Sequence, residues 1–505
     1  MTAQGVRQGC QGGHKAPESR ERVRTVGQAV RGVGVTIFME MKSFVPITKH
    51  RKILFSDVGK KCFLILFFFI ALALYFFAPY RYSLYFVSLV FILYIIDFVF
   101  YFSLKRTKNY FTFDFIFSIV FAFVYFMYPL FIFPLNKSRF FMFNYGFNEN
   151  VINKSTALAF IGYSVFTLGL LWKKEKSKNK REIQFKAVSM VVPNMAVASC
   201  VFLHLARRLT TSSVYSTGDA NPAASDGVWG YVSILQSAVI MAALSIEFYN
   251  QFHGLRKKNP VRNNPILFIL LLADILITFS NGSRSGALQI ILSILAGVSL
   301  LHNGFTLKKV FMLMLSGMAL LSFIMVARSG GAFQFSFNVL NMTMDLIVNN
   351  YTLYIGYDYV QNNGYVPFTL IGSLLNAIPM FSGLVVNTFG ISMYETSSAR
   401  YFSLLVLGDN PSFGVGTNII GALYLAGGLI FVIVFMFLLG CMISWLSADL
   451  RKSSLYKVVL YFTMIGLSVY IVRADYFYPV GKIVFEFFFA LLFVSTFIWK
   501  KQNGV

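Results

Sequence analysis

The chain has 505 residues, of which 57% are hydrophobic, 17% are aromatic and only 13% are charged, with a formal net charge of +24. Soluble domains carry about 25% charged residues, so this composition excludes an ordinary soluble protein. Apolar runs of about 20 residues recur along the chain, as in helical membrane proteins, and the short segments of alternating polarity typical of a membrane β-barrel are absent. The 4 cysteines and 5 histidines are dispersed, which predicts no disulfide framework and no metal site.

Residues 1–38 differ from the rest of the chain, because they are rich in Gly, Arg and Gln and contain no apolar run. A signal peptide needs an apolar core, so this segment is not one. It is either a disordered cytoplasmic extension or the product of a start codon assigned too early. The second interpretation fits the Phe- and Lys-rich composition that begins near Met39 and Met41.

Twelve apolar segments follow and predict an all-α polytopic membrane protein. They cover residues 62–79, 82–104, 111–135, 155–172, 187–205, 228–249, 265–280, 287–301, 310–327, 415–445, 455–472 and 480–499. Nine of these predicted helices lie within residues 39–327, and the last three lie within residues 414–505.

Lysine and arginine concentrate in every second loop between these segments, for example at 105–108, 173–186 and 256–262. Because cytoplasmic loops carry the excess of Lys and Arg, this alternation predicts that both termini are cytoplasmic. The positive net charge then follows from membrane topology, and we expect no nucleic-acid partner.

The loops that face outward carry a different set of cations, eight arginines and two lysines. They are Arg81, Lys137, Arg139, Lys154, Arg207, Arg208, Arg284, Arg328, Arg400 and Arg473. Arginine presents a planar fork of donors that suits phosphate and carboxylate groups. The outward face is therefore predicted to bind an anionic group, the alternative being chance in a set of ten residues.

The sequence NGSRSG at 281–286 forms a short turn between two of the predicted helices. The next helix starts at this turn, so its free N–H groups and its dipole favour an anion there. Arg284 would bind that anion with two parallel hydrogen bonds, assisted by the hydroxyls of Ser283 and Ser285. The alternative is that Arg284 only extends from a helix end toward the membrane surface.

The longest outward loop contains 86 residues, from 328 to 413. Loops of this length are usually functional or disordered, and this one has amphipathic runs such as 337–359. We expect one or two helices lying on the outer membrane surface, above the spans.

Several acidic residues fall inside or near the predicted spans, where charges are costly and need a partner. They are Asp97, Glu247, Asp274, Asp475 and Glu486. Asp97 and Asp274 are either internal hydrogen-bonded acids or part of a proton or substrate path. Glu486 follows Lys482 by four residues, so the two charges can neutralise each other. Asp475 lies two residues after Arg473, and it either holds that arginine or acts as a base.

The chain has no P-loop and no metalloprotease motif, so nucleotide-driven chemistry is not predicted. Outward arginines and a large outer loop suit the transfer of a glycan from a lipid-linked pyrophosphate. Arginine neutralises the charge that develops on the leaving pyrophosphate, and a carboxylate or histidine accepts the proton of the acceptor hydroxyl. This chemistry needs no metal ion and no cofactor.

Two short motifs carry a resemblance to a known family. The NGSRSG turn resembles the Ser-Arg-Gly signature of Wzy-type O-antigen polymerases, and residues 414–429, GVGTNIIGALYLAGGL, resemble the segment after their large outer loop. The related O-antigen ligases carry His-Asn at the end of that loop, whereas this chain has Asp409-Asn410. That difference favours a polymerase over a ligase.

The resemblance implies a GT-C-like helical fold in the bacterial inner membrane, with the loop 328–413 in the periplasm. It also implies undecaprenyl-pyrophosphate-linked glycans as donor and acceptor, an inverting glycosyl transfer, and a chain-length regulator as a further partner. Arg284 is the main expected pyrophosphate ligand, with Arg328, Arg400 and Arg473 added from their outward positions. The candidate bases are His204, Asp409 and Asp475. The alternative functions are an O-antigen ligase and a lipid-linked oligosaccharide flippase or exporter.

Overall fold

The computed structural model of the chain describes residues 57–105, 107–172, 187–210, 227–254, 259–280, 284–302, 304–328, 339–376, 386–411 and 413–502. Within these residues the secondary structure is entirely helical. The segment 1–38, for which two interpretations were open, lies outside the described residues.

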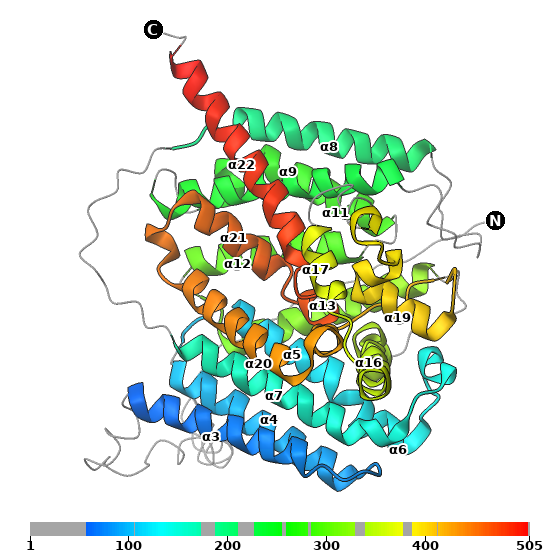
Figure 1. The fold of residues 1–505 in the computed structure, drawn as a ribbon. Coiled ribbons are helices and arrows are strands. Elements are labelled where there is room, and N and C mark those ends of the chain that lie inside the picture. Colours follow the sequence, from blue (N-terminus) through cyan, green and yellow to red (C-terminus); the bar gives the residue numbers. More distant parts are fainter. Residues whose placement is uncertain are drawn as a thin grey trace, which may run out of the picture. The chain divides into compact units, whose positions relative to one another are not determined.

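Helices occupy every one of the twelve predicted spans (Figure 1). The first six spans correspond to α3 (Asp57–Phe76), α4 (Leu84–Lys105), α5 (Phe113–Tyr125) with its continuation α6 (Phe133–Asn136), α7 (Ile152–Trp172), α8 (Val191–Thr210) and α9 (Gly227–Phe252). The last six correspond to α11 (Pro265–Ser280), α12 (Arg284–Leu301), α13 (Leu307–Arg328), α20 (Ile419–Ser447), α21 (Leu455–Gly466) and α22 (Tyr478–Gln502).

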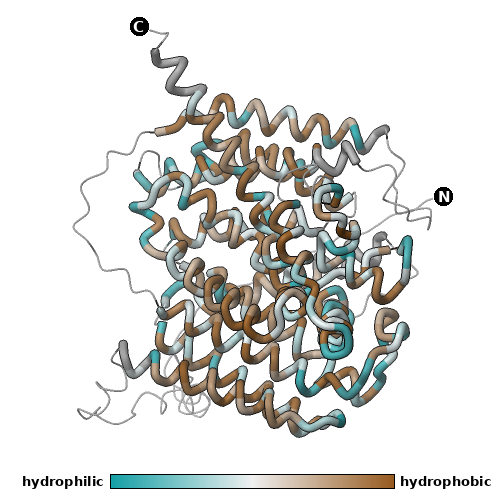
Figure 2. Tube along the Cα trace, in the orientation of Figure 1, coloured by the Kyte–Doolittle hydropathy of each residue, from teal (hydrophilic) through white to brown (hydrophobic). Residues whose placement is uncertain are grey.

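The lengths of these helices confirm a polytopic membrane protein but not the number of spans. Five described helices are long and apolar enough to cross a membrane, or six if the bent pair Phe113–Tyr125 and Tyr128–Asn136 is one span. Several others are apolar but shorter, including α11, α12 and α21. Hydrophobic residues run along the helices, and polar residues gather at the helix ends (Figure 2). The count of twelve spans stays a prediction.

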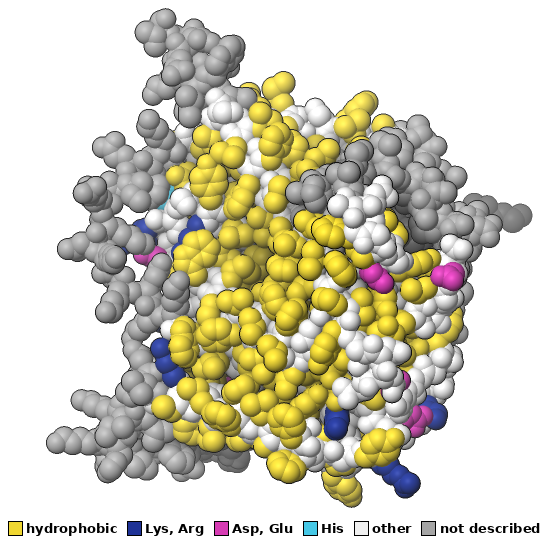
Figure 3. All heavy atoms as spheres, in the orientation of Figure 1, with side chains coloured by type: hydrophobic (Ala, Val, Ile, Leu, Met, Phe, Trp, Pro, Cys, Tyr) yellow, Lys and Arg dark blue, Asp and Glu magenta, His cyan; other side chains and the backbone are white. Residues whose placement is uncertain are grey.

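Basic side chains join the helix ends that the sequence predicts to be cytoplasmic, and we call this the basic end. Lys61 Nζ donates to the carbonyl of Trp172 at 3.2 Å, which joins the start of α3 to the end of α7. Lys105 forms an ion pair of 2.6 Å with Asp114, which joins α4 to α5. A broad hydrophobic surface lies between groups of charged side chains (Figure 3).

The described residues between α13 and α20, which we call the outer segment, lie at the opposite end (Figure 1). Within the described residues they form α14 (Val339–Met342), α15 (Met344–Ile347), α16 (Asn350–Asn363), α17 (Phe368–Leu375) and α19 (Ser398–Leu407). There are thus more helices than the one or two expected. The longest, α16, is largely buried and packs against α20, because its tyrosines and aliphatic residues face the bundle.

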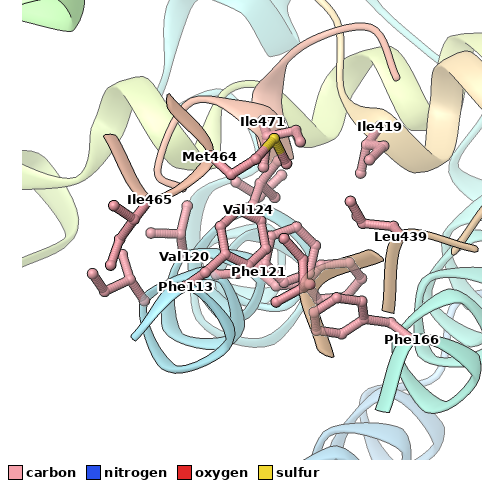
Figure 4. Close-up of a cluster of buried hydrophobic side chains, with 14 of the residues drawn as sticks. Phe113, Val120, Phe121, Val124, Phe166, Ile419, Leu439, Met464, Ile465 and Ile471 are labelled. Carbon is pink, nitrogen blue, oxygen red and sulfur yellow. The ribbon is translucent and has the colours of Figure 1, made fainter. Parts of the chain in front are cut away.

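The core beneath the outer segment is built around α7 and α20, which cross closely. A Cβ atom on Gly169 would overlap the carbonyl oxygen of Phe437, so glycine permits this close approach. Beside this crossing, α5 contributes Phe113 and Phe121 to a cluster that also contains residues of α7, α20 and α21 (Figure 4).

Asn418 joins the outer segment to this core by four hydrogen bonds. Its Oδ1 accepts from the Tyr125 hydroxyl at 3.0 Å and from the Gly421 N–H at 2.7 Å, which caps the start of α20. Its Nδ2 donates to the carbonyl of Asn349 and to the hydroxyl of Thr352, both at 2.8 Å. One amide side chain therefore connects α5, the outer segment and α20.

Helix α20 is broken at Gly427 and Gly428, eight residues after its start. Gly428 has φ +67° and ψ −154°, a conformation that is essentially restricted to glycine. The Val366 N–H donates to the carbonyl of Leu425 at 2.9 Å, so the outer segment satisfies a backbone group that the break releases. The ring of Tyr365 lies against the Cα of Gly428.

We expect Gly428→Ala to destabilise the protein, because alanine is strained at this φ and its methyl group would lie within 3 Å of the Tyr365 ring. The predicted cost is about 1–3 kcal/mol of unfolding free energy, measured as a lower melting temperature in detergent. Gly317→Ala in α13 is the matched control, since its methyl group would meet no atom within 4 Å. Equal melting temperatures for the two variants would contradict the proposed strain.

Candidate functional site

The NGSRSG sequence connects two packed helices, α11 and α12, and its last three residues belong to α12. Helix α11 ends at Ser280, and α12 begins at Arg284, so this arginine belongs to the first turn of α12 rather than to the loop before it. Ser285 is exposed one residue later. Ser283 and the side chain of Arg284 lie outside the part of the chain that is described. The arginine nevertheless starts at the helix end that carries the positive pole of the dipole.

His204 and Asp274 form a pair that the sequence did not predict, although each was singled out separately. They lie 70 residues apart, on α8 and α11, which pack together. His204 Nδ1 is 3.0 Å from Asp274 Oδ1, and both side chains are largely buried. Asp274 lies six residues before the end of α11, so the pair sits about 9 Å below the end of this helix.

This pairing defines the chemistry of the histidine. An ionised carboxylate can only accept a hydrogen bond, so Asp274 favours the tautomer with its proton on Nδ1. The second ring nitrogen, Nε2, is then the acceptor that can take a proton from a hydroxyl. A carboxylate behind the imidazole also stabilises the imidazolium that forms during such a transfer.

Asp475 lies in the segment between α21 and α22, and its carboxylate contacts the first turn of α19. Its Oδ2 accepts from the Ser397 hydroxyl at 3.0 Å, and its Oδ1 accepts from the Ser398 hydroxyl. The Ser398 N–H also bonds to this carboxylate. The Ser398 hydroxyl lies 2.7 Å from that of Thr417, just before α20. Asp475 therefore acts as an N-terminal cap for a helix elsewhere in the chain.

The electrostatic environment of Asp475 is mixed. Burial raises the pKa of this carboxyl above its ordinary value, and this effect exceeds the lowering by the two serine hydroxyls, the Ser398 N–H and the charge of Arg400. Since both oxygens are engaged, Asp475 is better suited to hold α19 than to accept a proton from a substrate.

Among the predicted outward arginines, Arg400 acts through its charge on this carboxylate. Arg400 lies on α19, is exposed, and donates from Nη1 to the Thr396 hydroxyl at 3.1 Å. Arg473 lies two residues before Asp475, with its guanidinium 5.6 Å from the centre of the Tyr470 ring. The structure thus brings together two of the candidate residues, Arg400 and Asp475, while Arg473 adjoins Asp475 in the sequence.

The remaining outward candidates are placed differently. Asp409 is exposed in the turn after α19 and makes no hydrogen bond or ion pair with the described residues. Arg328 ends α13, and its side chain lies outside the described part. Lys137 pairs with Glu149 at 2.6 Å, and Arg139 donates to Asn341 at 2.7 Å, so both cations already have partners in the protein.

The sequence did not reveal the role of Gln289, a buried amide on α12. It separates Lys482 from Glu486, which were expected to neutralise each other directly. In the sequence, the feature that could have indicated this role is a glutamine within an apolar run, four residues after Ser285. Among the described residues, no group of three or more His, Cys, Asp or Glu side chains could hold a metal ion.

Substitutions of Asp475 test whether it holds α19 or acts as a base. Asn keeps an oxygen that can accept a hydrogen bond, so we expect Asp475→Asn to retain most activity. Asp475→Ala leaves buried donors without acceptors and should lower the free energy of unfolding by about 1–3 kcal/mol. Glu149→Ala, which removes an exposed ion pair at the same end, is the control and should change stability by less than about 1 kcal/mol. Complete loss of activity in Asp475→Asn with unchanged stability would indicate a base.

Comparison with known proteins identifies the family. No curated protein and no solved structure matches the chain. A family model described as "O-antigen polysaccharide polymerase Wzy" matches residues 62–503, which include both motifs that carried the resemblance and extend from α3 into α22. This match covers most of the chain and confirms the resemblance, so the chain belongs to the O-antigen polysaccharide polymerase (Wzy) family.

Proposed function

We propose that this protein joins undecaprenyl-pyrophosphate-linked oligosaccharide repeat units into O-antigen polysaccharide at the periplasmic face of the inner membrane. The observation that carries the proposal is the family match over residues 62–503. Membership supports polymerisation of O-antigen repeat units by a membrane glycosyltransferase-like protein acting on lipid-linked oligosaccharides. The lipid carrier, the membrane face and the residue roles are the parts proposed here.

The proposed orientation has the basic end in the cytoplasm and the outer segment in the periplasm. Lys61 and Lys105 lie at the basic end, in agreement with the excess of Lys in cytoplasmic loops. In this orientation both termini are cytoplasmic, the chain has twelve spans in a GT-C-like arrangement, and the residues 328–413 face the periplasm. A chain-length regulator is the proposed protein partner.

The proposed donor site lies at the start of α12. Arg284 binds the pyrophosphate with its planar fork, and Ser283, Ser285 and free N–H groups of the first helical turn add hydrogen bonds. Positive charge that is already in place stabilises the negative charge that grows on the leaving pyrophosphate, so no metal ion is required. Arg328, Arg400 and Arg473 provide further positive charge at the same end.

The proposed base is His204, held by Asp274. The acceptor hydroxyl oxygen attacks the anomeric carbon of the donor, the bond from that carbon to the pyrophosphate oxygen breaks, and the hydroxyl proton moves to Nε2 of His204. A single displacement of this kind inverts the anomeric configuration. Asp409 is the alternative base because its carboxylate is exposed and makes no hydrogen bond or ion pair with the described residues. Asp475 holds α19, the helix that carries Arg400.

The direct test uses the purified protein in liposomes with a synthetic undecaprenyl-pyrophosphate-linked repeat unit. We expect products of two or more repeat units together with free undecaprenyl pyrophosphate. Transfer to a lipid A core acceptor without any polymer would indicate a ligase instead. Movement of the donor across the bilayer without a new glycosidic bond would indicate an exporter.

We predict that Arg284→Lys loses roughly a hundredfold in kcat/KM with an unchanged protein level, because lysine keeps the charge and loses the bidentate fork. Arg139→Lys is the control at the same end, since a single hydrogen bond to Asn341 can be made by either residue. Wild-type activity of Arg284→Lys would rule out the bidentate role.

We predict that His204→Gln reduces kcat by roughly a hundredfold or more, as for the loss of a general base. Asp274→Asn should reduce it less, and less than Arg284→Ala, because it only alters the orientation and charge of the imidazole. His253→Gln at the basic end, where the ring bonds to the Ser453 carbonyl, is the control. Full activity of the His204→Gln variant would show that another residue is the base.

A further inference from the structure

Lys482 lies near the start of α22 and directs its ammonium group toward α12. Its Nζ donates to Oε1 of Gln289 at 2.8 Å. Gln289 is almost fully buried and lies five residues after Arg284. At 1.5 Å per residue, the two positions are about 7.5 Å apart along the axis of α12. A second cation is therefore held within one and a half helical turns of the arginine.

The acid that balances this lysine lies deeper in the bundle. Glu486 is fully buried, one turn further along α22, and accepts from the Thr463 hydroxyl of α21. Its Oε1 also accepts from Nε2 of Gln289 at 3.4 Å. The glutamine thus bridges the two charged groups, with its oxygen toward the lysine and its nitrogen toward the glutamate.

Because Gln289 lies between them, Lys482 and Glu486 differ from an ordinary ion pair on a helix. Residues four apart on a helix can meet directly, as Lys and Glu often do. Among the described residues, however, Lys482 and Glu486 form no ion pair, whereas Lys105 and Asp114 at the basic end do. Besides Gln289, the ammonium lies 5.9 Å from the centre of the Tyr478 ring, and the charge of Glu486 acts on it without direct contact. Among the described residues, one of its three donors has a hydrogen-bond acceptor, the Gln289 oxygen.

We propose that Lys482 is a second cation of the diphosphate site, acting together with Arg284 on the lipid-linked donor. The inference rests on the function proposed above, in which α12 begins at the donor site. A diphosphate diester carries two negative charges, so one arginine cannot neutralise it. Two cations that repel each other in an apolar setting are stabilised when such an anion lies between them. When no donor is bound, the negative charge of Glu486 offsets the positive charge of Lys482.

The competing explanation is that Lys482 exists only to neutralise Glu486. The two explanations differ in a double variant that removes both charges. If Lys482 only neutralises Glu486, the double variant Lys482→Met with Glu486→Gln has a neutral, stable core and full activity. If the lysine binds the donor, the double variant is folded and still defective.

The experiment compares Lys482→Met, Glu486→Gln and the double variant in liposomes, with melting temperature measured for each. We expect the double variant to melt close to the wild type and to lose roughly tenfold or more in kcat/KM for the donor. Inorganic pyrophosphate, used as a competing anion, should inhibit it at least tenfold less strongly than the wild type. The control removes the other pair, Lys105→Met with Asp114→Asn, and should leave pyrophosphate inhibition unchanged.

A double variant with wild-type kinetics and wild-type inhibition by pyrophosphate would overturn this inference. That result would leave the proposed function standing, provided Arg284→Lys is still defective. A wild-type protein that forms no polymer from the lipid-linked donor would instead overturn the proposed function.

Discussion

The amide of Asn418 is the contact on which the outer half of the molecule depends. It caps α20, accepts from Tyr125 of α5 and donates to two positions of the outer segment. A second group of hydrogen bonds supports it, since the hydroxyl of Tyr75 lies 3.1 Å from that of Tyr357 and 3.3 Å from that of Tyr424. The outer segment is thus fixed to the spans by buried polar contacts. Such contacts are strong only when all partners are present.

The same requirement explains how charged groups are placed within the bundle. The described acids Asp97, Asp114, Asp274 and Glu486 each have a hydrogen-bond partner on another helix. Asp97 accepts from Thr167 of α7, Asp114 pairs with Lys105, and Glu486 accepts from Thr463. Among these acids, Asp274 pairs with a histidine, His204. The chemistry of this pair and its position below the NGSRSG turn separate it from the structural acids.

Sequence reasoning predicted the helices well because apolar length is a local property. The predicted span 265–280 coincides with α11, and every other span contains a helix. Details that depend on neighbouring helices were not predicted. Neither the burial of α16 nor the break at Gly427 and Gly428 was predicted, because both follow from how the outer segment packs on α20.

The candidate site was predicted only as separate residues. Arginines on outward loops were identified from topology, but the contacts of Asp475 with Ser397 and Ser398 join positions 78 and 77 residues apart. The His204–Asp274 pair and the Gln289 bridge likewise require three-dimensional packing between helices. A sequence pattern identifies residue types that suit a given chemistry. The fold determines which of these residues contact one another and which already have hydrogen-bond or ion-pair partners within the protein.

The central claim is that the protein polymerises repeat units at a site built around Arg284, and the lipopolysaccharide of intact cells tests it most directly. Cells that lack the gene would be complemented with the wild type or with Arg284→Ala, and their lipopolysaccharide separated by size. The account predicts a full ladder with the wild type and core bearing a single repeat unit with Arg284→Ala. A normal ladder with Arg284→Ala, or core without any repeat unit in the deleted cells, would contradict it.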